Sequence, residues 1–468
     1  MRNLVVICLD SVRKDFFDGH TPRIQALADV SCEGCRAASS WSVPSHASMF
    51  TGALPHRHGV HAHNLDFSTI PEEDLLTNEL AHTTLAVSAN KFLTEEFGFD
   101  SWFDGCINIR PDRVFPGGLD ARDSTGILNH LERSIAHDHP LRSIANGVFI
   151  QGLKTTNRLP VPTLTDDGAA AIVARSLDRI ETIDEPYFLF TNFMEAHVPH
   201  RDSIRYDRSE LNVPTGWQTA GFNYWSILEH GRMAVEAHEN EVEWFRSLYA
   251  AAISYLDRVV ASFVKELQAR SDREVTVVIT ADHGENLGYE SDGYQFEHTA
   301  SLSEGVLHVP LVIINPPSKP SIDESPEMWS HLDLPLLLRY LATEADESPF
   351  RKRDHVLAEV LGSHFGVNGP EGEHWKRAIR CLYDISGEEK YVWDSLGDTN
   401  TYRIDEDQPS WQQLAEMNID WKKVENYASE MFGEELSTCK NRIAETADAG
   451  PEDVSKSTQR RLKELGYI

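Results

Sequence analysis

The chain has 468 residues, of which 41% are hydrophobic and 9% aromatic, so it can bury a large core and is not a disordered chain. Its formal net charge of −31 argues against nucleic acid and anionic lipid as partners, because such an acidic surface repels both. Only 13 of the 43 basic residues are Lys. This acid-rich, Lys-poor composition predicts a halophilic protein whose acidic residues form a solvated coat.

The cysteines and the N-terminal residues indicate in which cellular compartment the protein is expected. Cys32 and Cys35 form one C-x-x-C pair with no second pair at zinc spacing, and nothing in the pattern of six cysteines demands disulfides. The chain runs from Met1 straight into a short apolar stretch, without a charged segment or a cleavage site. No run of eighteen apolar residues follows. We therefore expect a cytoplasmic protein without a membrane segment.

Four short apolar runs predict buried parallel strands, at residues 4–9, 187–193, 275–280 and 309–314. They are rich in β-branched and aromatic residues and lack strict alternation, as expected when helices cover both faces of a sheet. Helical patterns lie between them, at residues 22–29, 167–183 and 241–269. This alternation predicts an α/β fold with a large, mostly parallel sheet and helices on both faces.

The remaining segments suggest two departures from this plan. Residues 109–159 have mixed polarity and predict an insertion near the site that covers the rim of the sheet. Beyond residue 335 the pattern changes to short strands with turns, at 355–361, 378–383 and 390–394, and to a helical stretch at 455–468. We expect a catalytic domain at 1–335 and a smaller C-terminal α+β subdomain with a terminal helix at 336–468.

Polar residues follow three of the four predicted strands. Asp10 comes after the first, Glu195-Ala196-His197 after the second, and Asp282-His283 after the third. Ligands of open α/β sheets bind beyond the carboxyl ends of the strands, so these side chains are expected at one rim. Asp282 with His283 offers oxygen and nitrogen donors that suit Mn, Zn or Fe, whereas an all-oxygen site favours Ca or Mg. Taken singly, each motif could also be a turn or a helix cap.

Ser42 opens a run of small hydroxyl residues that ends at Gly52. A nucleophile at a helix N-terminus, facing a carboxylate at a strand end, is the geometry of metal-assisted ester cleavage. His197, His200 and His298 could each donate to an anionic group or protonate a leaving oxygen. The alternative is that these histidines lie in loops without a chemical role.

Residues 42–52 read Ser-Val-Pro-Ser-His-Ala-Ser-Met-Phe-Thr-Gly. This run resembles the sulfatase family of the alkaline phosphatase superfamily, whose pattern is Cys or Ser, any residue, Pro-Ser-Arg-Ala-Ser and then Thr-Gly. The similarity extends to residues 10–13, 21–23, 58–60, 188–199, 282–285, 309–311 and 465–467. It spans most of the chain, and with the acidic composition it suggests a haloarchaeal sulfatase-like hydrolase.

The resemblance implies a single divalent-metal site made by Asp10, Ser42, Asp282 and His283, with calcium as the usual ion. Ser42 falls at the nucleophile position, which sulfatases oxidise to formylglycine. The resemblance also implies contacts with the substrate, from His197 and His298 as catalytic residues and from Arg13, His46, Lys91 and His200 around its anionic group.

Two departures from the family pattern bear on the chemistry. His46 stands where the family has the Arg that helps direct the oxidation, so an unmodified Ser42 hydroxyl remains an alternative nucleophile. Ser11 replaces an Asp, and His283 stands where sulfatases commonly have Asn, which favours Mn, Zn or Fe over Ca. Both departures resemble phosphoryl-acting relatives.

We therefore expect a metal-dependent hydrolase of sulfate esters that acts on a small anionic ester or on a sulfated or phosphorylated glycan. One alternative is a phosphodiester or phosphonate monoester hydrolase, or a phosphoglycerol-type transferase, with unmodified Ser42. A second is a catalytically inactive relative that binds glycans.

Overall fold

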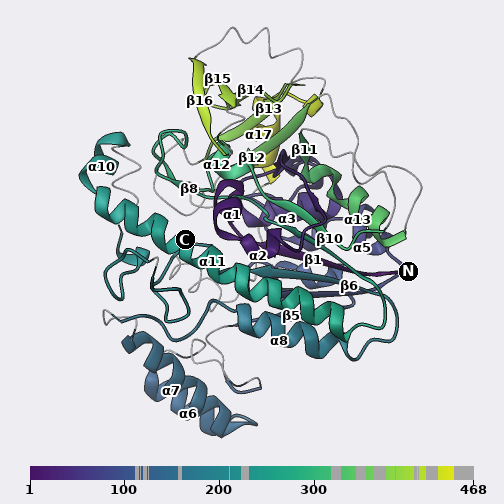
Figure 1. Cartoon of the computed structure of the whole chain (residues 1–468), viewed down its shortest axis with the longest axis vertical. Helices are drawn as coiled ribbons and strands as arrows, with labels where there is room; N and C mark the ends of the chain where they lie inside the picture. Colours follow the sequence, from purple (N-terminus) through teal and green to yellow (C-terminus); the bar gives the residue numbers. More distant parts are fainter. Residues whose placement is uncertain are drawn as a thin grey trace.

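The computed structural model describes residues 1–110, 115, 117–119, 124, 126–156, 161–209, 211–222, 231–317, 328–343, 355–362, 376–384, 386–404, 408, 410–417 and 431–446. The predicted terminal helix at 455–468 and the matching motif at 465–467 lie outside these residues. The described chain has a central sheet between two helical layers and a second, antiparallel sheet formed by C-terminal residues (Figure 1).

The central sheet has seven strands in the order β2-β10-β7-β1-β6-β4-β5. Their bounds are β1 Asn3–Leu9, β2 Val30–Ser31, β4 Thr83–Ser88, β5 Gly105–Asn108, β6 Tyr187–Phe193, β7 Val275–Thr280 and β10 Leu311–Ile314. β1 lies in the middle, parallel to β6 and β7, and its side chains are all buried. The predicted α/β class with a mostly parallel sheet is confirmed.

One predicted strand runs in the opposite direction to the expectation. β10 pairs antiparallel with β7, from Leu311 opposite Thr280 to Ile314 opposite Val277. The chain leaves β7 at its carboxyl end, forms loops and short elements at that rim, and re-enters the sheet from the same side. A strand that enters from the rim must run back along its neighbour.

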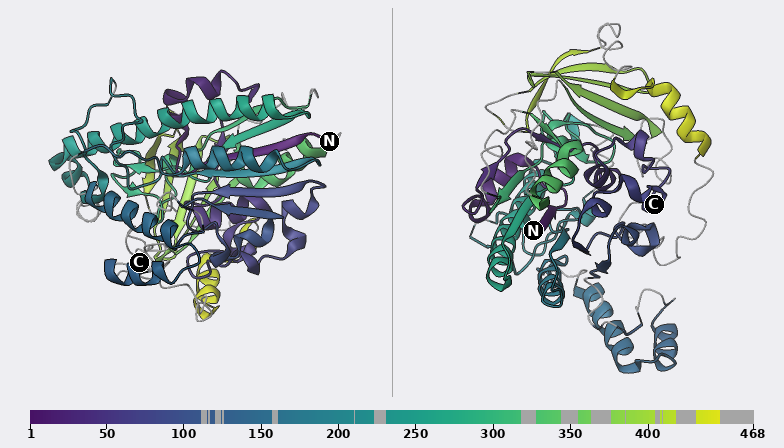
Figure 2. Two further views of the ribbon diagram at one scale, coloured as in Figure 1. Left: turned by 90° about the horizontal axis from the view of Figure 1, so that it is seen from below. Right: turned by 90° about the vertical axis from the view of Figure 1, so that its right-hand side faces the viewer.

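Helices cover both faces of the sheet (Figures 1 and 2). One layer contains α1 Lys14–His20, α2 Pro22–Gln25, α8 Ala169–Ile180 and α11 Glu239–Arg270. The other contains α3 Ser42–Thr51, α5 Leu76–Glu79 and α13 Leu334–Thr343. α11 is long and apolar enough to cross a membrane, but most of its apolar stretch is buried inside the protein. That burial is typical of a core helix.

The shorter elements are α4 Pro55–His58, α10 Arg232–Ala237, α12 Glu304–Leu307, β3 Cys35–Arg36, β8 Asn286–Leu287, β9 Phe296–Glu297 and β11 Trp329–Ser330. α6 Ile127–Ile135 and α7 Pro140–Thr156 form a helical pair whose mutual packing includes His130 Nε2 bonded to Ser143 O at 2.8 Å. Figure 2 shows this pair extending away from the body. Within the predicted insertion, Ile109 follows β5 at the rim, where its N–H donates to Ser88 O, and the insertion's role near the site stays a prediction.

The C-terminal sheet has five antiparallel strands in sequential order. They are β12 Val356–Leu361, β13 Ala378–Tyr383, β14 Glu389–Asp394, β15 Thr399–Ile404 and β16 Gln412–Met417, with α17 Leu436–Thr446 against β13. β12 to β14 coincide with the predicted strands. α13, which spans the predicted domain boundary at 335, packs against α3 and β1.

A buried cluster of charged and polar side chains joins the C-terminal sheet to β3 and α12, and we name it the Glu304 junction: Arg36, Glu304, Tyr383, Lys390 and Gln412. Arg36 and Lys390 lie 2.8 and 2.9 Å from the Glu304 carboxylate. Tyr383 donates to the same carboxylate, and Lys390 also donates to Gln412 at 3.1 Å. Burial alone would raise the pKa of Glu304, but Arg36 and Lys390 lower it to about 2.

Candidate active site

The ends of three neighbouring strands bring the predicted metal ligands to one place. Cys8 on β1 pairs with Thr280 on β7 and with Asn192 on β6, so the residues that follow these strands meet at the same rim. One ligand atom each from Asp10, Asp282 and His283 lies within 4.8 Å of the others. All three side chains are fully buried. The structure thus places the three candidates together, and their role as ligands stays a prediction.

Ser42 is the first residue of α3, after the extended residue Trp41. Pro44 lies in the first turn, where its missing N–H has no partner to lose. The Ser42 hydroxyl donates to Asp10 Oδ2 at 3.3 Å, so the candidate nucleophile touches the candidate metal site. Its position at a helix N-terminus favours negative charge near Oγ.

The donor set fits a divalent cation. His283 Nδ1 donates to Gly284 O at 2.8 Å, so in the neutral ring Nε2 carries the lone pair. Nε2 lies 3.4 Å from Asp282 Oδ2 and 4.0 Å from Asp10 Oδ1. Within the described part of the chain, neither His283 Nε2 nor Asp282 Oδ2 has a hydrogen-bond partner. Buried acceptors that face one another without a proton between them are costly unless a cation joins them.

Two asparagines that sequence reasoning missed hold Asp10 in place. Asn90 Nδ2 and Asn192 Nδ2 donate to Asp10 Oδ2 at 2.8 and 3.1 Å. Burial alone would raise the pKa of Asp10. The neighbouring histidines, of which His197 has the largest effect, instead lower this pKa below its ordinary value. A buried amide inside the predicted strand at 187–193 was the available signal for Asn192, because a polar side chain there needs a partner.

His197, His298 and Lys91 are buried beside the centre. The His298 ring is 5.3 Å from that of His197 and 4.3 Å from that of His283, measured between centroids. His197 Nδ1 donates to Val198 O at 2.6 Å. Burial lowers the pKa of His197 to about 3 and that of His298 well below its ordinary value, and Lys91 contributes to both shifts. Both rings are therefore neutral near pH 7.

Glu285 is a further member of the site that the sequence did not reveal as such. Its Oε2 lies 3.0 Å from His298 Nδ1, and the side chain is fully buried. Burial raises the pKa of Glu285 to about 8, so the carboxyl is protonated near neutral pH. Glu285 and His298 Nδ1 therefore share a hydrogen bond whose direction is set by the tautomer of the ring.

Arg13 and His200 do not reach toward the centre. Arg13 donates to Asp15 at 2.9 Å, to Asp292 at 3.0 Å and to the Glu285 carbonyl at 3.1 Å. With its donors engaged, Arg13 has a structural role, and the structure does not support the prediction that it binds the substrate anion. His200 is buried with its ring edge-on to aromatic rings of α11, at 5.0 and 5.5 Å, so it lies in a hydrophobic contact instead.

His46 contacts the backbone of Ser42, the candidate nucleophile. Its Nδ1 donates to Ser42 O at 2.6 Å and lies 3.6 Å from Asp282 Oδ2. The ring is fully buried and packs edge-on to Phe190 at 5.7 Å. His46 therefore contacts the backbone of Ser42 rather than a substrate, contrary to the prediction of direct anion binding.

Comparison with known proteins agrees with this arrangement. Residues 2–336, more than half of the chain, match the family model described as Sulfatase, and the chain belongs to the sulfatase family. It is similar to iduronate 2-sulfatase of Mus musculus, with 24% identity over 179 residues, which cover 34% of this chain and 32% of that protein. The alignment thus spans about a third of the relative's length.

Two solved structures share the fold. The phosphonate monoester hydrolase of Agrobacterium radiobacter aligns with a TM-score of 0.59 and 15% identity, over 95% of this chain and 96% of that one. BT1596, a 2-O GAG sulfatase, aligns with a TM-score of 0.56 and 17% identity, over 98% and 96%. At these identities the likeness shows the sulfatase and alkaline phosphatase fold, and it does not distinguish sulfur from phosphorus chemistry.

Proposed function

We propose that this sulfatase-family chain is a metal-dependent hydrolase of sulfate esters, with Ser42 or its formylglycine form as the nucleophile. The observation that carries the proposal is the buried set of Asp10, Asp282 and His283 with the Ser42 hydroxyl 3.3 Å from Asp10. A divalent cation held there, Ca by family resemblance or Mn, Zn or Fe by the imidazole donor, would lower the pKa of the nucleophilic hydroxyl and polarise the ester.

As part of this proposal we assign different tautomers, and therefore different roles, to His197 and His298. Because His197 Nδ1 donates to Val198 O, its Nε2 carries a lone pair and can accept the proton of the attacking hydroxyl. Protonated Glu285 donates to His298 Nδ1, so His298 Nε2 carries a proton for the leaving alkoxide. As the bond from the nucleophile to sulfur forms, the bond from sulfur to the alcohol oxygen breaks, and that oxygen takes the Nε2 proton of His298 while the Glu285 proton moves to His298 Nδ1. Water then displaces the sulfate group from the nucleophile: one water proton returns to Glu285 through His298, and His197 gives its proton back to the nucleophile oxygen.

The charge that builds on the reacting group has two stabilisers in this chain. The N-terminus of α3 directs backbone N–H groups toward the Ser42 position, and Lys91 lies close enough to lower the pKa of both catalytic histidines. Asn90 and Asn192 keep Asp10 oriented while this charge develops.

A second candidate is a hydrolase of phosphonate monoesters or phosphodiesters, or a phosphoglycerol-type transferase, with an unmodified Ser42. His46 is the observation that favours it, because a histidine bonded to the Ser42 backbone occupies the place of the arginine that helps direct oxidation. An inactive glycan-binding relative is disfavoured, because a chain that had lost its chemistry would have no need for buried acceptors that only a cation satisfies.

Mass spectrometry of the Ser42 peptide from the native host tests the proposal. A loss of two hydrogens, with metal-dependent turnover of 4-nitrophenyl sulfate, would support sulfate-ester hydrolysis. An unmodified Ser42 with turnover of phenyl phosphonate monoesters and none of 4-nitrophenyl sulfate would replace it with the second candidate. Ser42→Ala is the control in both assays.

A further inference from the structure

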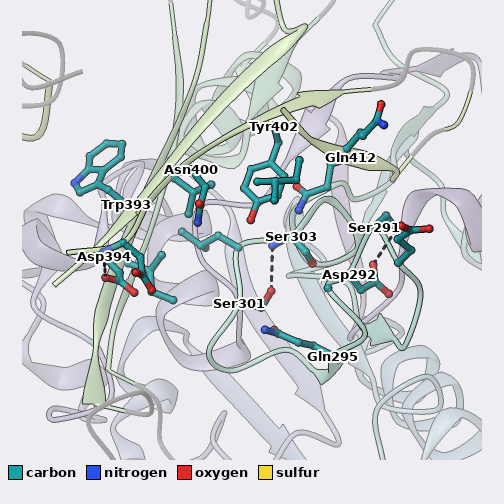
Figure 3. Close-up of a pocket in the computed structure, with 18 of the residues that line it drawn as sticks. Ser291, Asp292, Gln295, Ser301, Ser303, Trp393, Asp394, Asn400, Tyr402 and Gln412 are labelled. Carbon is teal, nitrogen blue, oxygen red and sulfur yellow. Dashed lines mark hydrogen bonds between the residues drawn. The ribbon is translucent and has the colours of Figure 1, made fainter. Parts of the chain in front are cut away.

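A cavity of about 540 Å³ lies between the C-terminal sheet and the loop at residues 290–303 (Figure 3). Strands β13 to β16 form one wall and the loop forms the other. Of the described residues that line it, none is a candidate metal ligand or catalytic residue. Its volume is in the range of small-molecule binding sites.

The loop that lines the cavity also carries His298. Gln295, Ser301 and Ser303 line it and flank His298 in the sequence. Ser303 Oγ donates to Asn286 at 2.6 Å, and Asn286 donates to the carbonyl of Glu297 at 2.6 Å, so the loop is held rigidly. A molecule in the cavity would contact residues on both sides of His298 in the sequence.

The lining combines partly exposed aromatic rings with planar amides. Tyr402 and Trp411 supply rings, and Asn400 and Gln413 supply amide groups. Such a surface suits a molecule that has both C–H faces and many hydroxyl groups. The aromatic rings pack against the C–H faces, and the amides donate hydrogen bonds to the hydroxyl groups and accept hydrogen bonds from them. A sugar ring has this chemistry, whereas an aliphatic or aryl alcohol leaves the amides unpaired.

The charge of the lining narrows the choice of sugar. It contains four carboxylates, Glu290, Asp292, Asp394 and Asp398, and one guanidinium, Arg377. Asp292 is paired with Arg13 at 3.0 Å, and Asp394 with Arg377 at 3.1 Å. The two further carboxylates leave the cavity net negative, so a ring with its own sulfate or phosphate group would be repelled.

We propose that this cavity is a subsite for an uncharged sugar ring within the alcohol part of the ester, an assignment that rests on the proposed function. The ester group then lies at the metal centre, and the neutral ring lies across the His298 loop. Binding energy from such a remote ring contributes to turnover by orienting the ester.

The metal-loaded full chain is titrated with cellobiose, lactose and N,N′-diacetylchitobiose and with their O-sulfated forms, by saturation-transfer NMR and Trp fluorescence. We expect at least one neutral disaccharide to bind and its sulfated form to bind more weakly. Asn400→Ala and Tyr402→Ala should weaken that binding about tenfold or more, with turnover of 4-nitrophenyl sulfate unchanged. Met417→Ala, exposed on β16 and outside the lining, is the matched control.

The assignment is overturned if no neutral disaccharide binds, if sulfated forms bind more tightly, or if the variants bind as the wild type does. Asn400→Asp, which keeps the shape and adds a carboxylate, replaces Asn400→Ala if the latter does not fold. Saccharide binding that is sensitive to these variants, without turnover of any sulfate or phosphonate ester, would support the subsite and reject the proposed hydrolase. Ester turnover without saccharide binding would support the proposed hydrolase and reject the subsite.

Discussion

The candidate active site and the Glu304 junction are both buried clusters of charged side chains, yet they are satisfied in different ways. At the junction, Arg36, Lys390 and Tyr383 converge on one carboxylate. At the active site, His283 Nε2 and Asp282 Oδ2 face one another without a donor among the described residues. In the first cluster opposite charges pair within the chain, whereas in the second two acceptor atoms face one another, as they would around a bound cation.

This difference shows how burial can serve stability in one place and chemistry in another. A buried charge with partners holds elements together, and removing one partner leaves an uncompensated charge. Buried acceptors without partners are unfavourable for folding and are kept where a ligand completes them. Substitutions in the Glu304 junction should therefore change stability, whereas substitutions in the candidate active site should change activity and metal binding.

The largest effect is expected at the nucleophile. Ser42→Ala removes the attacking hydroxyl and should lower kcat for the active ester by at least about 10³-fold, with little change in thermal stability. Steady-state kinetics with 4-nitrophenyl sulfate and a phosphonate monoester measure kcat, and calorimetry measures the thermal stability. Residual turnover near the wild-type level would show that Ser42 is not the nucleophile.

Breaking the junction should affect stability instead. Glu304→Gln leaves Arg36 and Lys390 buried beside a neutral group and should lower the free energy of unfolding by about 3–5 kcal/mol, measured by urea denaturation. Glu33→Gln is the matched control, because Glu33 pairs with Lys14 from an exposed position, 71% accessible, and its loss should cost about 1 kcal/mol or less. Equal losses in the two variants would contradict the distinction between the clusters.

Completing the active site should stabilise the chain. A divalent ion at about 100 times its Kd should raise the free energy of unfolding by about 2.7 kcal/mol if it binds the folded state alone. The check is a thermal melt of chelator-treated protein with Mn²⁺, Zn²⁺ or Ca²⁺ added back. Asp282→Asn should abolish most of the increase, and an unchanged increase in that variant would place the ion elsewhere.

Glu195, outside both clusters, offers a third case, because one oxygen of its buried carboxyl has no hydrogen-bond partner among the residues that the structure describes. Its Oε1 accepts from Ala169 N at 2.7 Å, and burial raises its pKa from 4.5 to about 8. The folded state therefore keeps a proton that the unfolded chain releases above pH 4.5. Stability contributed by this group is present below that pH and is lost as the pH rises toward 8.

Relative to Glu195→Gln, the wild type should lose up to about 1.4 kcal/mol of unfolding free energy per pH unit between pH 5 and 8. Urea denaturation of both proteins across this range gives the difference. Parallel pH profiles would show that Glu195 is ionised in the folded state and has a partner beyond Ala169.

Much of the site could be predicted because it follows from strand ends. Asp10, Asp282 and His283 each come directly after a buried run, and parallel neighbours place such residues together whatever the helices do. Ser42 was visible as the start of a hydroxyl-rich helix. Asn192 was not, because it lies inside β6, and a strand pattern does not show which buried residue faces a neighbouring carboxylate.

The errors have a common cause in contacts between distant segments. Arg13 was expected at the substrate because the sequence displays its charge but not Asp292, its partner 279 positions away. β10 was expected to be parallel because an apolar run carries no direction. β15 and β16 were missed because their sequences are polar and half exposed, which leaves little periodic signal.

The Glu304 junction also constrains how this chain can change over evolutionary time. Lys390 on β14 donates to the carbonyl of Leu302, four residues after His298, so a strand of the C-terminal sheet directly holds the loop that carries His298. The C-terminal sheet is therefore not a module that can be lost or exchanged by recombination alone. A chimera that takes residues 355–417 from a relative would inherit a misplaced His298 unless Arg36, Glu304 and Lys390 came from the same parent.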